Sequence, residues 1–258
     1  MALLLAVGLL SLSARAEVQT RELNYEVDGR EYRGYLAWDA AADGPRPGVL
    51  VVHEWWGHND YARRRARDLA AEGYTALALD MYGKGRVADH PEDAGKFMQA
   101  LMNDLDAAAR RFDKAHDLLD AHPQADPDRT AAIGYCMGGA VVLQMARFGK
   151  DLDAVVSFHG SLGTERPAKP GAIQSEILVL TGGSDPFVPP KQVEAFRAEM
   201  DSVGADYTVH VYPEAKHSFT NPGADELGQR FDLPLAYSPE ADRDSWQRML
   251  EFFDQHLD

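Results

Sequence analysis

The segment that most constrains this chain is Gly134-Tyr135-Cys136-Met137-Gly138, which contains the only cysteine among 258 residues. The apolar run at 130–133 before it predicts a buried strand, and the apolar run at 139–143 after it predicts a buried helix. A strand, a G-x-C-x-G turn and a helix together indicate a nucleophile elbow with sulfur in place of oxygen. The turn places the thiol at a helix N-terminus, where the helix dipole favours thiolate. We therefore interpret Cys136 as a nucleophile; the alternative is a small buried hydrophobic side chain.

The elbow requires an acid and then a histidine later in the chain, because that is their order in the α/β-hydrolase fold. Asp185 follows an apolar run at 176–180 that predicts a strand, and His217 follows an alternating strand pattern at 207–212. His217 would act as general base toward the thiol and then as acid toward the leaving group, while Asp185 orients its ring. An Asp in this position also suits a turn or a helix cap, which is the alternative for Asp185.

The order of the predicted elements indicates the fold class. Two strands at 18–27 and 30–38 flank Asp28-Gly29 and predict an antiparallel hairpin. Strands and helices then alternate, which predicts an α/β-hydrolase fold with a mostly parallel, doubly wound sheet. Loops at 81–91, 160–175 and 218–240 follow strand ends, and we expect them to cover the active site. The predicted strands lie at 49–53, 75–80, 130–135, 153–158, 176–181 and 207–212, and the predicted helices at 59–72, within 92–121, and at 138–148, 190–203 and 241–256.

From about Gly48 to the C-terminus the sequence resembles the dienelactone hydrolase family. The resemblance implies hydrolysis of a small ester or lactone through a thioester acyl-enzyme, without a metal or an organic cofactor. The segments that carry it are His53-Glu54-Trp55-Trp56-Gly57, Asp80-Met81-Tyr82, Gly134-Tyr135-Cys136-Met137-Gly138-Gly139, Ser157-Phe158-His159-Gly160, Gly183-Ser184-Asp185 and His217-Ser218-Phe219.

The resemblance also implies roles that spacing alone does not reveal. Glu54 would contact the resting thiol and move aside when substrate binds; the alternative is an exposed carboxylate at a strand end. The backbone N–H groups of Trp55 and Met137 would form the oxyanion hole, in agreement with the mechanics of the elbow. The remaining substrate-binding candidates, several of which would equally suit ordinary packing, are Trp56, Tyr82, Lys84, His159 and Phe219.

The charged groups near these motifs bear on the substrate. Members of the family that act on anionic lactones hold the substrate carboxylate with two arginines. Here Lys84 and Arg86 follow Tyr82, and no arginine follows His217 closely. A lysine cannot form the bidentate fork that orients a carboxylate, so we expect better use of neutral small esters or lactones.

Other features exclude some classes of protein. His53 and His58 are five residues apart in a loop, whereas a zinc-protease helix needs two histidines four apart, so we expect no metal site. The net charge of −15 argues against nucleic acid and anionic membranes as partners. A single cysteine allows no internal disulfide.

The N-terminus is typical of a signal peptide at residues 1–16, which would leave a mature domain at 17–258. An apolar core at 2–10 precedes an A-x-A cleavage pattern at Ala14-Arg15-Ala16. We therefore expect a secreted or periplasmic protein, without a membrane association after cleavage. A charged n-region is almost absent, so an uncleaved, cytoplasmic protein is the alternative.

Three other functions fit parts of this pattern. A related esterase or thioesterase would use the same triad on a different acyl substrate. A redox-responsive thiol protein would use Cys136 alone, although the absence of a resolving cysteine counts against it. An inactive binding protein is disfavoured because all three triad positions are occupied.

Overall fold

The computed structural model describes residues 16–257, so the predicted signal peptide, apart from Ala16, lies outside the described residues. A single eight-stranded sheet crosses the molecule in the order β1-β2-β4-β3-β5-β6-β7-β8. β1 and β2 form the antiparallel hairpin, β2 pairs antiparallel with β4, and all later neighbours are parallel. The strands are β1 (Val18–Val27), β2 (Arg30–Asp39), β3 (Arg46–Val52), β4 (Thr75–Leu79), β5 (Ala125–Tyr135), β6 (Ala154–Phe158), β7 (Glu176–Gly182) and β8 (Tyr207–Tyr212).

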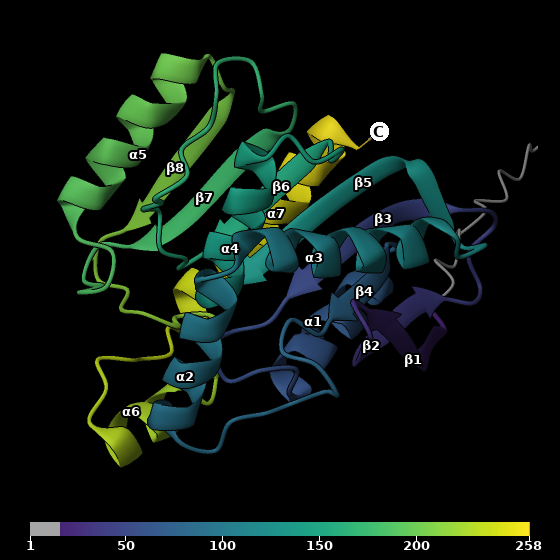
Figure 1. Cartoon of the computed structure of the whole chain (residues 1–258), viewed down its shortest axis with the longest axis horizontal. Coiled ribbons are helices and arrows are strands. Elements are labelled where there is room, and N and C mark those ends of the chain that lie inside the picture. The colour runs from purple at the N-terminus through teal and green to yellow at the C-terminus, as the bar shows by residue number, and fades with distance from the viewer. Residues whose placement is uncertain (1–15, 258) are drawn as a thin grey trace, which may run out of the picture.

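Helices cover both faces of the sheet (Figure 1). Apolar side chains of α3, α4 and α5 pack on one face, and those of α1 and α7 pack on the other. α2 and α6 lie together at one end of the molecule, where Phe97 and Phe231 share a small apolar cluster with Trp56. The helices are α1 (Asp60–Ala71), α2 (Pro91–Met102), α3 (Leu105–Asp120), α4 (Met137–Arg147), α5 (Pro190–Val203), α6 (Ala224–Phe231) and α7 (Pro239–His256).

This architecture confirms the predicted α/β fold with a mostly parallel sheet and an antiparallel hairpin at its start. The strands β3, β4 and β6 and the second half of β5 (130–135) are buried on both faces, which is why they are nearly continuous apolar runs. Parallel strands end at the same edge of the sheet, so the loops that follow β5, β7 and β8 meet there.

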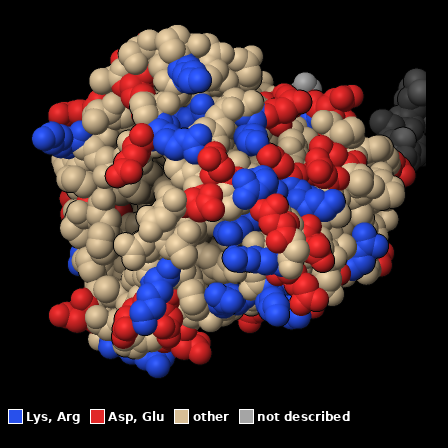
Figure 2. Space-filling model, viewed as in Figure 1, with Lys and Arg blue, Asp and Glu red and all other residues tan. Residues whose placement is uncertain are grey.

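The surface is acidic overall but mixed in sign. Figure 2 shows basic side chains interspersed with acidic ones on one face. Charged side chains from different segments of the chain also form ion pairs, such as Arg110 with Asp28 and Arg166 with Asp106. Among residues 16–257, no helix combines the length and the apolar composition that crossing a membrane requires.

Candidate active site

The turn between β5 and α4 holds Cys136 in a conformation that few residues adopt. Its φ is 55° and its ψ is −116°, outside the allowed regions for most L-residues. A Cβ on Gly138 would lie 2.2 Å from the carbonyl oxygen of Val52, so only glycine lets α4 approach β3 this closely. The N–H of Cys136 lies 3.0 Å from the carbonyl oxygen of Phe158, which helps to fix the turn.

Three side chains from separate strand ends meet at this turn. Nε2 of His217, in the loop after β8, lies 3.0 Å from Sγ of Cys136. Nδ1 of His217 lies 2.7 Å from Oδ2 of Asp185, which follows β7. Oδ1 of Asp185 accepts the N–H of Phe187 at 2.8 Å, so the carboxylate is held on both sides. The structure thus brings together the nucleophile, base and acid positions that the sequence predicted.

The surroundings of His217 favour its charged form. Burial by itself disfavours the imidazolium. The electrostatic interaction with Cys136 and the hydrogen bonds to Asp185 and Cys136 outweigh burial, and the pKa of His217 rises to about 10.

Glu54 is placed differently from its expected resting contact. The carboxylate is buried, and it accepts hydrogen bonds from Oγ of Ser218 at 2.9 Å and from Nδ2 of Asn221 at 2.6 Å. Among the described residues, no hydrogen bond joins it to Cys136, whose thiol faces His217 instead. Burial raises the pKa of Glu54, although both hydrogen bonds and the charge of His217 oppose the rise. It is therefore neither an exposed strand-end carboxylate nor a partner of the thiol in this structure.

The two backbone N–H groups that the sequence predicted as an oxyanion hole, those of Trp55 and Met137, have no acceptor among the described residues. Met137 is the first residue of α4, so its N–H has no acceptor within the helix. Within the described chain, no hydrogen bond occupies the N–H of Trp55. The hydroxyl of Tyr82 lies 3.0 Å from both the carbonyl oxygen of Trp55 and Sδ of Met137, and it therefore ties the two segments together.

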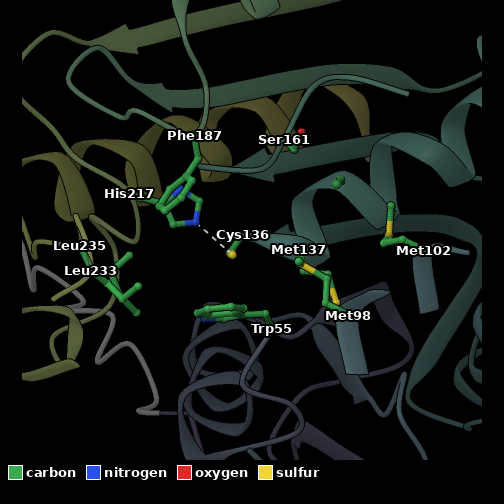
Figure 3. Close-up of a pocket in the computed structure, with 11 residues that line it drawn as sticks. Trp55, Met98, Met102, Cys136, Met137, Ser161, Phe187, His217, Leu233 and Leu235 are labelled. Atoms are coloured by element: carbon green, nitrogen blue, oxygen red, sulfur yellow. Dashed lines mark hydrogen bonds between the residues drawn. The ribbon is translucent and has the colours of Figure 1, made fainter. Parts of the chain in front are cut away.

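A cavity of about 400 Å³ opens over Cys136. Its walls are almost entirely apolar, and none of the lining residues is Lys, Arg, Asp or Glu. Figure 3 shows Cys136 near the middle, with His217 and Phe187 to one side, Met98 and Met102 to the other, and Trp55 below. The lining residues are Trp55, Met98, Met102, Cys136, Met137, Ala140, Ser161, Phe187, His217, Leu233 and Leu235.

The prediction of which loops cover the site is only partly correct. Ser161 and Leu233 come from the loops expected to cover the site, but the wall near 81–91 is formed instead by α2, which follows that loop. Met98, Met102, Phe187, Leu233 and Leu235 were not identified from the sequence. Met98 and Met102 are one helical turn apart, and this is the only signal the sequence offers for them.

Five predicted substrate-binding residues do not line the cavity. Trp56 and Phe219 are buried against other aromatic rings. Tyr82 is not part of the cavity lining, and its hydroxyl contacts the carbonyl oxygen of Trp55 and Sδ of Met137 instead. Lys84 has a side chain that is 72% exposed and lies 3.9 Å from Glu31.

His159, the fifth, supports the elbow from beneath. Its Nδ1 accepts the N–H of Cys136 at 3.1 Å, and its Nε2 lies 2.8 Å from Oγ1 of Thr220. Burial holds its pKa well below the usual range, so the ring stays neutral and can accept at Nδ1. Thr220 in turn lies 2.6 Å from the hydroxyl of Tyr61, and its carbonyl oxygen accepts from the buried Arg65.

His53 and His58 have structural partners instead of a shared ligand. Nδ1 of His53 lies 2.6 Å from the carbonyl oxygen of Glu54, while Nε2 accepts the N–H of Met81. Nε2 of His58 lies 2.9 Å from the carbonyl oxygen of Ala78. Burial and the nearby His53 lower the pKa of His58 to about 4. No group of three or more potential metal ligands occurs within residues 16–257.

A strand–elbow–helix, an acid after β7 and a histidine after β8 define the class of the α/β-hydrolases. The model of the dienelactone hydrolase family matches residues 32–257. The chain therefore belongs to the dienelactone hydrolase family, a family of carboxylic ester and lactone hydrolases.

Individual relatives agree with this assignment. A protein named "Putative carboxymethylenebutenolidase" from Escherichia coli K12 is 30% identical over 237 residues, which cover 88% of this chain and 84% of the relative. A protein of the same name from Yersinia pestis is 29% identical over 88% of this chain and 85% of its own length. A solved dienelactone hydrolase-like promiscuous phosphotriesterase from metagenomic libraries is 37% identical, with a TM-score of 0.86 over 93% of this chain and 99% of its own.

Proposed function

We propose that this protein hydrolyses small, neutral carboxylic esters or lactones through a Cys136–His217–Asp185 triad and a thioester acyl-enzyme. The observation that carries the proposal is the continuous contact from Sγ through the imidazole to the carboxylate, at 3.0 Å and 2.7 Å. A nucleophile, a base and an orienting acid at hydrogen-bond distance form the arrangement that acyl transfer requires.

The mechanism begins from a thiolate and an imidazolium. The thiolate of Cys136 attacks the carbonyl carbon, and the oxyanion accepts hydrogen bonds from the N–H groups of Trp55 and Met137. His217 then gives its proton to the departing alkoxide as the carbon–oxygen bond breaks, which leaves a thioester and a neutral imidazole. Water that loses a proton to this imidazole attacks the thioester and releases the acid. The proton then stays on His217, and the starting ion pair is restored.

A direct test is the capture of the thioester. With p-nitrophenyl esters we expect a burst of one p-nitrophenol per enzyme, and acid quenching should add the mass of one acyl group to the peptide that contains Cys136. Cys136→Ala should abolish both signals while retaining the native circular dichroism spectrum. Full turnover by Cys136→Ala, or a mass increase on another residue, would refute the mechanism.

The cavity supports neutral substrates because its lining offers no lysine or arginine for a carboxylate, and the one cationic group, the His217 imidazolium, already contacts Asp185 and Cys136. Arg86, like Lys84, lies outside the lining and its guanidinium stacks 4.9 Å from the centre of the Phe97 ring. A solved relative is described as a promiscuous phosphotriesterase, and this description supports neutral phosphotriesters as a second proposed substrate class for Cys136. Stoichiometric phosphorylation of Cys136 by a p-nitrophenyl phosphotriester would support this second activity, and its absence at millimolar substrate would exclude it.

A further inference from the structure

The cavity extends in two directions from Cys136, and each direction has its own wall. On one side Phe187 lies next to His217, with 5.0 Å between the ring centres, and Leu235 forms a β-bridge with His217. On the other side Met98 and Met102 project from α2, beyond Met137 (Figure 3). We call the first wall, with Leu233, the leaving-group arm, and the wall of Met98, Met102, Met137 and Ala140 the acyl arm.

Reaction geometry assigns one half of an ester to each arm. In the tetrahedral intermediate the carbon carries the sulfur, the oxyanion, the leaving oxygen and the acyl carbon. The oxyanion points to the N–H groups of Trp55 and Met137. The leaving oxygen must receive its proton from Nε2 of His217, which lies 3.0 Å from Sγ. The leaving group therefore lies on the side of His217, and the acyl chain extends the opposite way.

Resting on the function proposed above, we propose that the acyl arm selects substrates with an apolar acyl chain, while the leaving-group arm accepts a separate apolar alcohol. Three of the four residues of the acyl arm are methionines, whose flexible thioethers adapt to chains of different shape. A cavity of about 400 Å³ with apolar walls at both ends suits an open-chain ester with two apolar halves. The substrate class is therefore neutral esters of medium-length fatty or arylalkyl acids.

The first test is a chain-length series of p-nitrophenyl esters from acetate to octanoate. We expect kcat/KM to rise by roughly fourfold for each methylene group that the acyl arm buries. Met102→Trp fills this arm and should lower the octanoate-to-acetate ratio of kcat/KM at least tenfold. Gln99→Trp adds the same bulk to the exposed side of α2 and should keep the parent ratio. An unchanged ratio in Met102→Trp would overturn the assignment.

The second test separates the two arms by reaction step, because the alcohol has left before deacylation begins. With one acyl group and alcohols of increasing size, Leu233→Trp should slow the burst much more than the deacylation that follows. Met102→Trp should slow both steps. The opposite pattern would reverse the arms, and equal effects of both variants on both steps would also overturn the proposal.

Two controls keep failure of the arms distinct from failure of the proposed function. The rate of iodoacetamide alkylation of the single thiol reports whether each variant retains a folded elbow. Met98→Ala enlarges the acyl arm and should favour bulkier acyl groups. If Cys136→Ala retains the burst, the proposed mechanism fails. If the burst depends on Cys136 but the octanoate-to-acetate ratio of kcat/KM is the same in the parent and in the Met98 and Met102 variants, only the assignment of the arms fails.

Discussion

Glu54 and Cys136 follow neighbouring strands, β3 and β5, yet no hydrogen bond joins them within the described residues. Ser218 and Asn221 donate to both carboxylate oxygens of Glu54 and so hold it away from the thiol. Hydrogen bonds to a charged group contribute about 1.5–3 kcal/mol each, which is enough to decide between two positions of the side chain. These two residues come from the loop that also carries His217, so the same segment carries the proposed base and restrains Glu54.

The first prediction concerns this restraint. Removing both donors with Ser218→Ala and Asn221→Ala should let the Glu54 carboxylate approach Cys136. Its negative charge should then favour the protonated thiol of Cys136 over the thiolate. Alkylation by iodoacetamide at pH 7 should then slow about tenfold or more. Glu54→Gln in the same background removes the carboxylate charge and should restore most of the rate. A double variant that alkylates like the parent would show that Ser218 and Asn221 do not control the thiol.

The second prediction concerns the alkaline limb of activity. His217 must be protonated to donate to the leaving group, so kcat/KM should fall as pH rises through its pKa of about 10. Asp185 raises this pKa, and Asp185→Asn should therefore move the limb to lower pH as well as reduce the rate. The measurement is kcat/KM from pH 7 to 11, corrected for spontaneous ester hydrolysis. If kcat/KM fell at the same pH in the parent and in Asp185→Asn, Asp185 would not be the residue that raises the pKa of His217.

At the scale of elements, the elbow depends on how closely α4 approaches β3. A Cβ at Gly138 would meet the backbone of Val52 at 2.2 Å, and backbone atoms cannot move aside as a flexible side chain can. Gly95, in the middle of α2, has no atom within 4 Å of an added Cβ. The two glycines therefore differ in what fixes them, although both lie in helices.

The third prediction compares these two glycines. Gly138→Ala should destabilise the protein by at least about 2 kcal/mol, as expected when a tightly packed site is overfilled, and should abolish burst activity. Gly95→Ala should stabilise it by roughly 0.5–1 kcal/mol, because alanine loses less backbone entropy in a helix. Urea unfolding of the three proteins measures both changes. Equal stability of Gly138→Ala and the parent would contradict the packing argument.

The elements predicted from periodicity agree with the structure within a few residues. Other elements were not predicted, because they depend on tertiary contacts that no local sequence pattern reveals. α6 lies inside the predicted loop 218–240; it has only eight residues, and Leu227 and Phe231 pack on a cluster formed with α2. The first half of β5 was missed because its residues are polar, with Pro127 at an irregularity in the pairing with β3. Periodicity therefore identifies elements buried in the sheet better than short ones held at its end.

The candidate site divides in the same way. The sequence identified the three neighbouring residues Cys136, Asp185 and His217 because the elbow, the strand ends and the order of acid and histidine are fixed by the fold. The cavity wall was not identified, because residues next to a motif often point away from the site. Trp55 faces the cavity, whereas Trp56 packs into an apolar cluster with residues of α2 and α6. Met98 and Leu233 reach the cavity from segments far apart in the chain, and only tertiary packing brings them there.

At the scale of the whole molecule, an acidic surface surrounds a cavity that has no Lys, Arg, Asp or Glu in its lining. The net charge of −15 repels anions during their approach, and salt screens this effect. Inside, a substrate carboxylate would lose its hydration without gaining a lysine or arginine partner, because the His217 imidazolium is already paired with Asp185 and Cys136. Repulsion by the net charge and desolvation in the cavity can be separated experimentally, because only the repulsion depends strongly on ionic strength.

The last prediction follows from that separation. A lactone that carries a carboxylate should have a kcat/KM at least tenfold below that of its methyl ester at low salt. Raising the salt to 0.5 M should narrow the gap but not close it, because desolvation inside the cavity remains. Leu233→Arg places a cation at the cavity wall and should favour the free acid, while Gln99→Arg on the exposed side of α2 controls for net charge. A preference of the parent for the free acid at both salt concentrations would contradict this account and point to Lys84 or Arg86 as an anchor.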